Sequence, residues 1–181
     1  MVLLQSKQTL TLAKKVPEFE LIGVDSKAYQ LSNFAGKPLL LIFMCNHCPY
    51  VIPQIGNIKK LADKWKEKIT VIGINSNDAK KYPEDSYDNM IMFAQKNKFN
   101  FIYLYDDTQK VAKSYDAQCT PDPFLIDKYG KLAWHGRLND MLNLGDKKTK
   151  DDMDEAISQL LSTGKVNKEF LPSQGCSIKW K

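Results

Sequence analysis

The sequence predicts an α/β fold, and two short apolar runs separated by a helical segment are the main evidence. Residues 38–44 and 69–74 are mostly apolar, which is typical of strands buried on both faces of a sheet. Between them, five apolar residues recur at helical spacing: Val51, Ile55, Ile58, Ala62 and Trp65. This helix is expected to end near Lys68. A strand–helix–strand unit of this kind should be parallel with a right-handed crossover.

The segment before this unit has the pattern of a β-hairpin. Residues 19–22 and 28–31 are two candidate strands, and they flank the longer turn Gly-Val-Asp-Ser-Lys at 23–27. Gly36 then precedes the first buried strand. We therefore expect an N-terminal β-hairpin extension to the α/β core.

The elements after the unit alternate between helix and strand. A polar loop over 75–85 leads to a helix from about Ser86, whose inner face carries Met90, Phe93 and Ala94. Four further elements are expected: a strand at 101–104, a short helix at 108–114, an antiparallel hairpin of 123–126 with 132–135, and an amphipathic helix at 151–161. Acidic residues begin the last helix, where the helix dipole favours them.

The chain is expected to form a single domain over residues 1–181. No repeat, low-complexity tract or linker interrupts it, and 181 residues are enough to bury a core. The tail over about 164–181 is expected to be irregular.

Composition narrows the class of protein. The net charge of +5 comes almost wholly from lysines scattered among 21 acidic residues, so nucleic-acid binding is not expected. Residues 1–15 do not resemble a secretory signal, and no apolar stretch approaches the roughly 20 residues that span a membrane. We expect a cytoplasmic protein, where paired cysteines tend to be catalytic, redox-sensing or metal-binding.

A Cys-x-x-Cys pair, Cys45-Asn46-His47-Cys48, follows the first buried strand and is expected to open the next helix. Free backbone N–H groups and the helix dipole favour a thiolate there. Cys45 is the candidate nucleophile and Cys48 the candidate resolving thiol of a redox pair. The alternatives are two inert buried cysteines or half of a zinc site, which would want four ligands.

The order of elements resembles the thioredoxin fold, a central mixed sheet flanked by helices. The resemblance is narrower to peroxiredoxin-like proteins, related to the AhpC/TSA and TlpA/ResA groups, that keep a Cys-x-x-Cys. It covers nearly the whole chain and is carried by five segments: 43–51, 75–78, 82–86, 119–122 and 172–181.

The resemblance implies roles for three residues. Pro121 corresponds to the cis-proline that faces the cysteines, and Thr120 would expose its backbone for strand-like pairing with a substrate beside Cys45. An ordinary trans turn is the alternative. His47 would stabilise the Cys45 thiolate, as in the more oxidising protein disulfide isomerase and DsbA proteins, or would simply face solvent.

Two further cysteines are candidates for additional redox roles. Cys119 lies close to Pro121 in the sequence and is either a third redox partner or a small buried hydrophobe. Cys176 lies in the tail, which could fold back to provide a second resolving thiol. His135, in a predicted strand, is expected to be a packing or hydrogen-bonded residue.

Residues that the related families use, and that this sequence lacks, also constrain the chemistry. Peroxiredoxins place a threonine three residues before their peroxidatic cysteine, and Cys45 occupies that position relative to Cys48. No arginine lies between Cys119 and Asp127, so fast peroxidase activity is not expected. The strand at 38–44 also lacks the buried acid of thioredoxin, so water or His47 would have to accept a proton.

We therefore predict a thiol–disulfide oxidoreductase acting on disulfide or thiol substrates, protein or small molecule. A thioredoxin-like dithiol donor is the expected partner; no cofactor, metal, nucleic acid or membrane is expected. A peroxidase with an antioxidant role is the first alternative, with Cys119 or Cys176 resolving. A non-enzymatic metal or cluster carrier using Cys45, Cys48, Cys119 and a histidine is the second. A non-catalytic binding module is the third.

Overall fold

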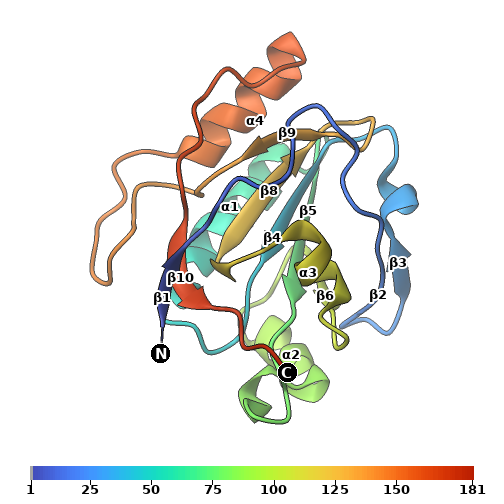
Figure 1. Ribbon diagram of the computed structural model, residues 1–181, viewed down its shortest axis with the longest axis vertical. Helices are drawn as coiled ribbons and strands as arrows, with labels where there is room; N and C mark the ends of the chain where they lie inside the picture. The colour runs from blue at the N-terminus through green and yellow to red at the C-terminus, as the bar shows by residue number, and fades with distance from the viewer. Residues whose placement is uncertain (1) are drawn as a thin grey trace.

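A mixed sheet with helices on both faces forms the centre of the computed structural model, which describes residues 2–181 (Figure 1). Its strands, in spatial order, are β3 (Ala28–Gln30), β2 (Glu20–Gly23), β6 (Ile102–Tyr105), β5 (Thr70–Asn75), β4 (Leu39–Phe43), β8 (Asp122–Ile126) and β9 (Leu132–His135). β4, β5 and β6 are parallel, whereas β8 runs antiparallel to β4. The predicted mixed α/β sheet and its N-terminal hairpin are confirmed.

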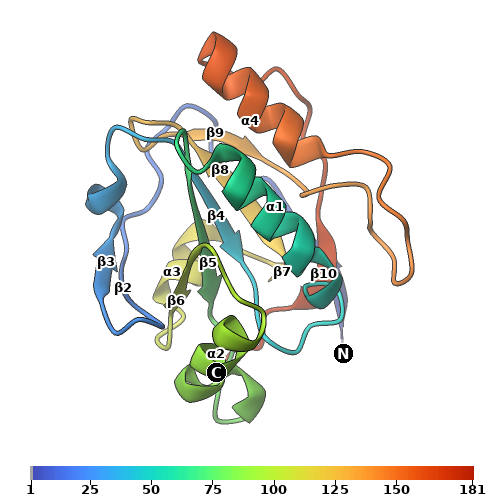
Figure 2. The same ribbon diagram turned by 180° about the vertical axis from the view of Figure 1, so that it is seen from behind.

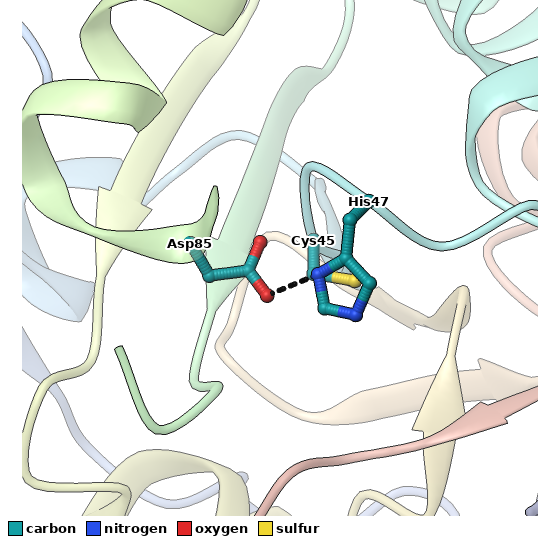
Figure 3. A group of neighbouring side chains, drawn as sticks. All are labelled: Cys45, His47 and Asp85. Carbon is teal, nitrogen blue, oxygen red and sulfur yellow. Dashed lines mark ion pairs between the residues drawn. The ribbon is translucent and has the colours of Figure 1, made fainter. Parts of the chain in front are cut away.

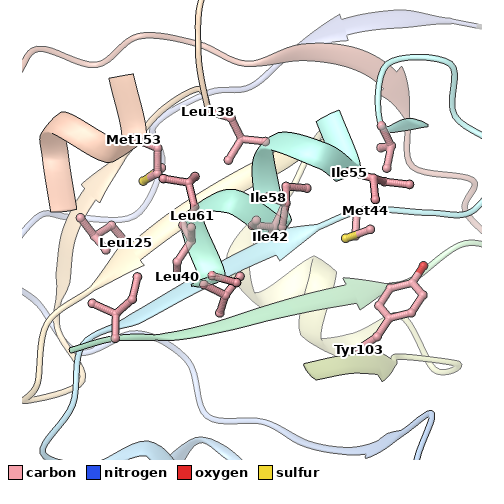
Figure 4. Close-up of a cluster of buried hydrophobic side chains, with 14 of the residues drawn as sticks. Leu40, Ile42, Met44, Ile55, Ile58, Leu61, Tyr103, Leu125, Leu138 and Met153 are labelled. Atoms are coloured by element: carbon pink, nitrogen blue, oxygen red, sulfur yellow. The ribbon is translucent and has the colours of Figure 1, made fainter. Parts of the chain in front are cut away.

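Strand β4 lies at the centre of the sheet and contributes to a core on each face. Leu40 and Ile42 face α1 (Ile55–Trp65) and α4 (Asp152–Thr163), which cover the face shown in Figure 2. Figure 4 shows this cluster with Ile58 of α1 packed over the strand. The alternate residues of β4 face the opposite core, beneath α3 (Lys110–Tyr115). Each such buried side chain contributes roughly 1.5–3 kcal/mol, so β4 and the loop after it are held firmly.

The remaining helical segments are short or lie at the edges of the sheet. They are η1 (Leu31–Phe34), η2 (Ile52–Gln54), η3 (Pro83–Asp85) and α2 (Tyr87–Lys96). The Ser86 side chain caps α2 by accepting a hydrogen bond from the Asn89 backbone N–H, and the helix begins close to the predicted start near Ser86. None of the helices within residues 2–181 is long and apolar enough to cross a membrane.

The predicted helix at the cysteines begins later than expected. The chain leaves Cys48 in turns and the short 3₁₀ segment η2, and α1 starts only at Ile55. Pro53 has no backbone N–H to donate to the carbonyl four residues earlier, so a regular α-helix cannot run through this segment. The cysteines therefore lie in the loop between β4 and η2, outside a first α-helical turn.

The expectation of an irregular tail is wrong over residues 174–177. These residues form β10 (Gln174–Ser177), which lies between β1 (Leu3–Gln5) and β7 (Cys119–Thr120) in a separate small sheet. Figure 1 shows β10 beside β1 at the same edge of the molecule. The strand forms because both flanking segments supply backbone partners, a long-range effect that its own four residues do not encode.

Candidate dithiol site

The two cysteines of the Cys-x-x-Cys pair meet the segment just before β8. Cys45 Sγ lies 3.6 Å from the Thr120 hydroxyl oxygen, and the Cys48 thiol donates to the Thr120 carbonyl oxygen over 3.2 Å. Both cysteines are buried, and the peptide bond between Thr120 and Pro121 is cis. The structure thus brings together the four residues that the resemblance placed at one site.

The backbone of Thr120 is covered by the tail of the chain, contrary to the expectation that it would be exposed. β10 pairs antiparallel with β7, with Cys176 opposite Thr120. The approach is so close at Gly175 that an added Cβ would lie 2.0 Å from the Thr120 carbonyl oxygen. Cys176 Sγ lies 3.0 Å from Cys48 Sγ, which places a third thiol beside the pair. The tail does fold back onto the site.

Asp85, which the sequence analysis did not single out, is the buried acid of the site. Its carboxylate forms an ion pair with His47, with 2.8 Å between Oδ2 and Nδ1 (Figure 3). It also accepts hydrogen bonds from the backbone of Asn46 and from the side chains of Asn75 and Asn77. Asp85 is the last residue of η3, so the buried acid of this site comes from a short 3₁₀ segment and not from the strand before the cysteines.

His47 is half-buried between Asp85 and an aromatic neighbour. Its ring stacks on Tyr82, with ring centroids 5.6 Å apart. The Asp85 carboxylate raises the pKa of His47, although burial opposes the charged form. Burial also disfavours ionised Asp85, but hydrogen bonds from His47 and Asn77 outweigh it and lower the pKa of that carboxyl. His47 is therefore held as a proton donor and acceptor beside Cys45.

Proton affinity differs sharply among the three clustered sulfurs. A hydrogen bond to Cys48, then burial, then the charge of Asp85 raise the pKa of Cys45. Hydrogen bonds from Cys45, Thr120 and Cys176 outweigh burial and lower the pKa of Cys48 to about 5. Burial and the neighbouring Cys48 raise the pKa of Cys176 to about 12. These directions favour ionisation of Cys48 over Cys45 and Cys176 in the reduced site, whereas the order of attack by Cys45 and Cys48 stays a prediction.

Cys119 and His135 lie behind the site. Cys119 is fully buried, and burial raises the pKa of its thiol, which favours its interpretation as a small hydrophobe. His135 pairs with Asp122 at 2.7 Å and stacks on Phe124, and both members of the ion pair are buried. His135 is thus the hydrogen-bonded strand residue that the sequence analysis expected.

A metal ion fits the site poorly. Within residues 2–181, Cys45, His47 and Asp85 are the one group of three or more histidine, cysteine or acidic residues that could hold a metal, with ligand atoms within 4.8 Å of one another. This set omits Cys119, which the carrier hypothesis requires. Both oxygens of Asp85 already accept hydrogen bonds, and a closed zinc site wants four ligands. The donor set is better suited to proton transfer than to metal storage.

A surface cleft of about 310 Å³ reaches the site from the side of His47. It is lined by residues of the cysteine loop, η3 and α2: Asn46, His47, Glu84, Asn89, Met92, Phe93 and Lys96. A larger cavity of about 600 Å³, between the N-terminal hairpin and the β8–β9 turn, includes none of the cysteines. The smaller cleft is lined by Asn46 and His47, which lie between the two cysteines in the sequence, and by none of the cysteines themselves.

Comparisons with known proteins agree with this geometry. The model of the AhpC/TSA family matches residues 12–135. The thiol-disulfide oxidoreductase ResA of Bacillus thuringiensis subsp. konkukian is 22% identical over 155 residues, 85% of this chain and 81% of that protein. Peroxiredoxin Bcp of Bacillus subtilis is 24% identical over 166 residues, 84% of this chain and 96% of that protein. An uncharacterized conserved protein from Geobacillus kaustophilus is 39% identical, with a TM-score of 0.93 over 100% of this chain and 97% of that chain.

Proposed function

Because this chain belongs to the AhpC/TSA family, we propose that it is a thiol–disulfide oxidoreductase that works through the Cys45–Cys48 dithiol. The observation that carries the proposal is the contact of both thiols with Thr120, next to a cis-proline and an acid–base pair. A thiolate, a second thiol within reach and a group that moves protons are the requirements of disulfide exchange.

The reaction has two exchange steps. The Cys48 thiolate attacks one sulfur of a substrate disulfide, and the other substrate sulfur leaves as a thiolate. Cys45 then attacks the Cys48 sulfur of the mixed disulfide, which forms the Cys45–Cys48 bond and releases the second substrate sulfur. His47 lies beside Cys45 and takes its proton, and Asp85 stabilises the resulting imidazolium. The reverse sequence oxidises a dithiol substrate.

The partners follow from this chemistry. The substrate is a disulfide or thiol, on a protein or a small molecule, and a thioredoxin-like dithiol returns the oxidised pair to the reduced state. A cytoplasmic setting belongs to the proposal, because a reducing compartment keeps clustered thiols available for exchange. No organic cofactor takes part in either step.

Peroxide reduction is the second candidate, and the low pKa of Cys48 and the similarity to peroxiredoxin Bcp favour it. A Cys48 thiolate would attack one peroxide oxygen and Cys45 would resolve the sulfenic acid. Two features count against a fast reaction and against an antioxidant role. Cys45 replaces the threonine that positions peroxide, and Arg137, the sole arginine of the sequence, pairs with Asp152 of α4.

The proposal is tested with a variant in which only the Cys-x-x-Cys pair can react. Reduced Cys176→Ser protein is treated with one equivalent of oxidised glutathione, and peptides are mapped by mass spectrometry. We expect an internal Cys45–Cys48 disulfide, and reduction of insulin disulfides when a dithiol is supplied. Cys119→Ser is the matched control and should behave as the unsubstituted protein. Failure of the pair to form, together with insulin reduction no faster than with dithiol alone, would reject the proposed function.

The order of attack is tested by trapping. Cys45→Ser should retain substrate on Cys48 when Cys176 is also replaced by serine, whereas Cys48→Ser should trap little. Stable adducts on Cys45 in the Cys48→Ser protein would restore the order first predicted from the sequence.

A further inference from the structure

Cys176 lies where a sulfur of a bound substrate would be expected. The resemblance implies that a substrate pairs as a strand beside the residue before the cis-proline, and β10 occupies that place opposite Thr120. Its cysteine Sγ is 3.0 Å from Cys48 Sγ, although the two residues are 128 positions apart in the sequence. A disulfide needs about 2.05 Å, so a shift of about 1 Å would join them.

Contacts on both sides hold Cys176 in this place. Before it, the backbone of Ser6 donates to the Ser173 carbonyl, and β1 pairs along the outer edge of β10. After it, the backbone of Lys179 donates to Asn77 Oδ1 and accepts from the backbone of Asp78. Asn77 also donates to Asp85, so the tail is tied to the acid of the site. Cys176 is thus positioned by the fold.

We propose that Cys176 is a third redox-active residue, which exchanges with the Cys45–Cys48 disulfide to form a Cys48–Cys176 disulfide. This inference rests on the proposed function and names a further catalytic residue for it. The tail would then act as an internal substrate whose sulfur is always within reach.

The step is an internal thiol–disulfide exchange and needs no outside oxidant. Cys176 gives its proton to a solvent water and attacks Cys48 Sγ; the Cys48–Cys176 bond forms as the Cys45–Cys48 bond breaks. The departing Cys45 sulfur takes up a proton, which His47 can deliver. The two electrons were accepted earlier by the substrate disulfide, so the exchange conserves oxidation state. The Cys48 charge that holds up the pKa of Cys176 is absent once Cys48 is in a disulfide, which eases ionisation of the attacking thiol.

The exchange has a structural outcome. A Cys48–Cys176 bond ties β10 across Thr120 and keeps the substrate-pairing edge covered, whereas reduction leaves only the strand contacts to hold the tail. The reductant that recycles the enzyme must therefore act on a bond between the loop after β4 and the tail.

The experiment uses Cys45→Ser, which leaves three of the four cysteines. Reduced protein is treated with oxidised glutathione, excess reagent is removed, and the intact mass and tryptic peptides are recorded. We expect loss of two thiols, no retained glutathione, and a cross-link between peptides 28–59 and 169–179. The added substitution Cys176→Ser should instead leave glutathione on Cys48, whereas added Cys119→Ser should change nothing.

A second measurement on the unsubstituted protein covers the case in which Cys45→Ser fails to fold. Oxidised with one equivalent of glutathione disulfide, it should yield a fraction in which peptides 28–59 and 169–179 are joined. If Cys45→Ser keeps glutathione as the double variant does, or the folded parent never yields the joined peptides, the inference is wrong. The proposed function stands in that case if Cys176→Ser still forms the Cys45–Cys48 disulfide.

Discussion

Gly175→Ala should loosen the tail from the dithiol site without changing any reacting group. The glycine packs against the backbone of Thr120, where an added Cβ would lie 2.0 Å from the carbonyl oxygen and 2.8 Å from the carbonyl carbon. Both neighbours are backbone atoms, so no flexible side chain can move aside. Either β10 leaves β7, or the segment that carries the cis-proline shifts.

The size of the effect follows from the cost of overpacking. Forcing an extra methyl group into a packed site costs about 1–3 kcal/mol. Because β10 lies in a small sheet of its own, this cost falls on the docked tail and leaves the seven-stranded sheet intact. The equilibrium for opening the tail should therefore rise about 5- to 150-fold.

The assay is alkylation of Cys48 in a Cys45→Ser background, followed by mass spectrometry of peptide 28–59. Cys48 is fully buried, so at low reagent concentration its rate reports the open fraction. Gly56→Ala is the matched control: a Cβ at that position of α1 meets nothing within 4 Å, so the rate should stay unchanged. Hydrogen exchange of the backbone amides of β4, which lies in the seven-stranded sheet, serves as the reference for global unfolding.

Two results would refute the reasoning. An unchanged Cys48 rate in Gly175→Ala would mean that the close approach to Thr120 does not hold the tail. An equal rise in Cys48 alkylation and in hydrogen exchange of the β4 amides would mean that the whole protein opens, and that the tail is not a separately opening unit.

The other predictions concern charge, potential and stability. Asp85→Asn should bring the pKa of His47 down to about 6.5 or below, measured by NMR; an unchanged value would disprove the assigned cause. The His47–Asp85 ion pair should contribute most to the free energy of unfolding between about pH 4 and 6.5. Below this range the contribution is lost as Asp85 protonates, and above it the contribution is lost as the pH rises through the raised pKa of His47. Denaturant titrations of the unsubstituted protein and of Asp85→Asn across this pH range test the prediction. A difference in unfolding free energy that does not change with pH would count against it. The Cys45–Cys48 couple of Cys176→Ser should have a potential above the roughly −270 mV of thioredoxin, because a stabilised Cys48 thiolate favours the reduced form; a glutathione titration at or below that value would contradict it. Oxidation of Cys45→Ser should raise its unfolding free energy by about 5 kcal/mol, since the new bond closes a loop of 128 residues, and no change in the denaturation midpoint would argue against that bond.

The sequence predicts the central sheet well because burial leaves a strong local signal there. β4 and β5 are apolar on both faces, and the hairpin of β8 and β9 surrounds a turn with glycine. The placement of Thr120 and Pro121 beside the cysteines came from the resemblance to a known fold. Local pattern alone does not indicate a contact across 72 residues.

The sequence does not predict the role of Asp85 or the strand β10, for a different physical reason. Asp85 is recognisable as buried only when Asn75, Asn77 and His47 converge on it from other segments. β10 has the sequence Gln-Gly-Cys-Ser, which has no apolar alternation, and it becomes a strand only between two partners. The order of proton affinities depends on the hydrogen bonds among the three sulfurs and on how deeply each is buried, which sequence spacing cannot give.

Both ends of the described chain contact segments that hold the tail in place, with a practical consequence for anyone who prepares this protein. Leu3 is the direct strand partner of Cys176, and Lys181 donates through its backbone to Gln109, whose side chain also holds the tail (Figure 1). A purification tag fused at either terminus would begin within a few residues of these contacts. Rates and potentials should accordingly be measured after tag removal, or with tags on opposite ends compared, before any value is assigned to the enzyme itself.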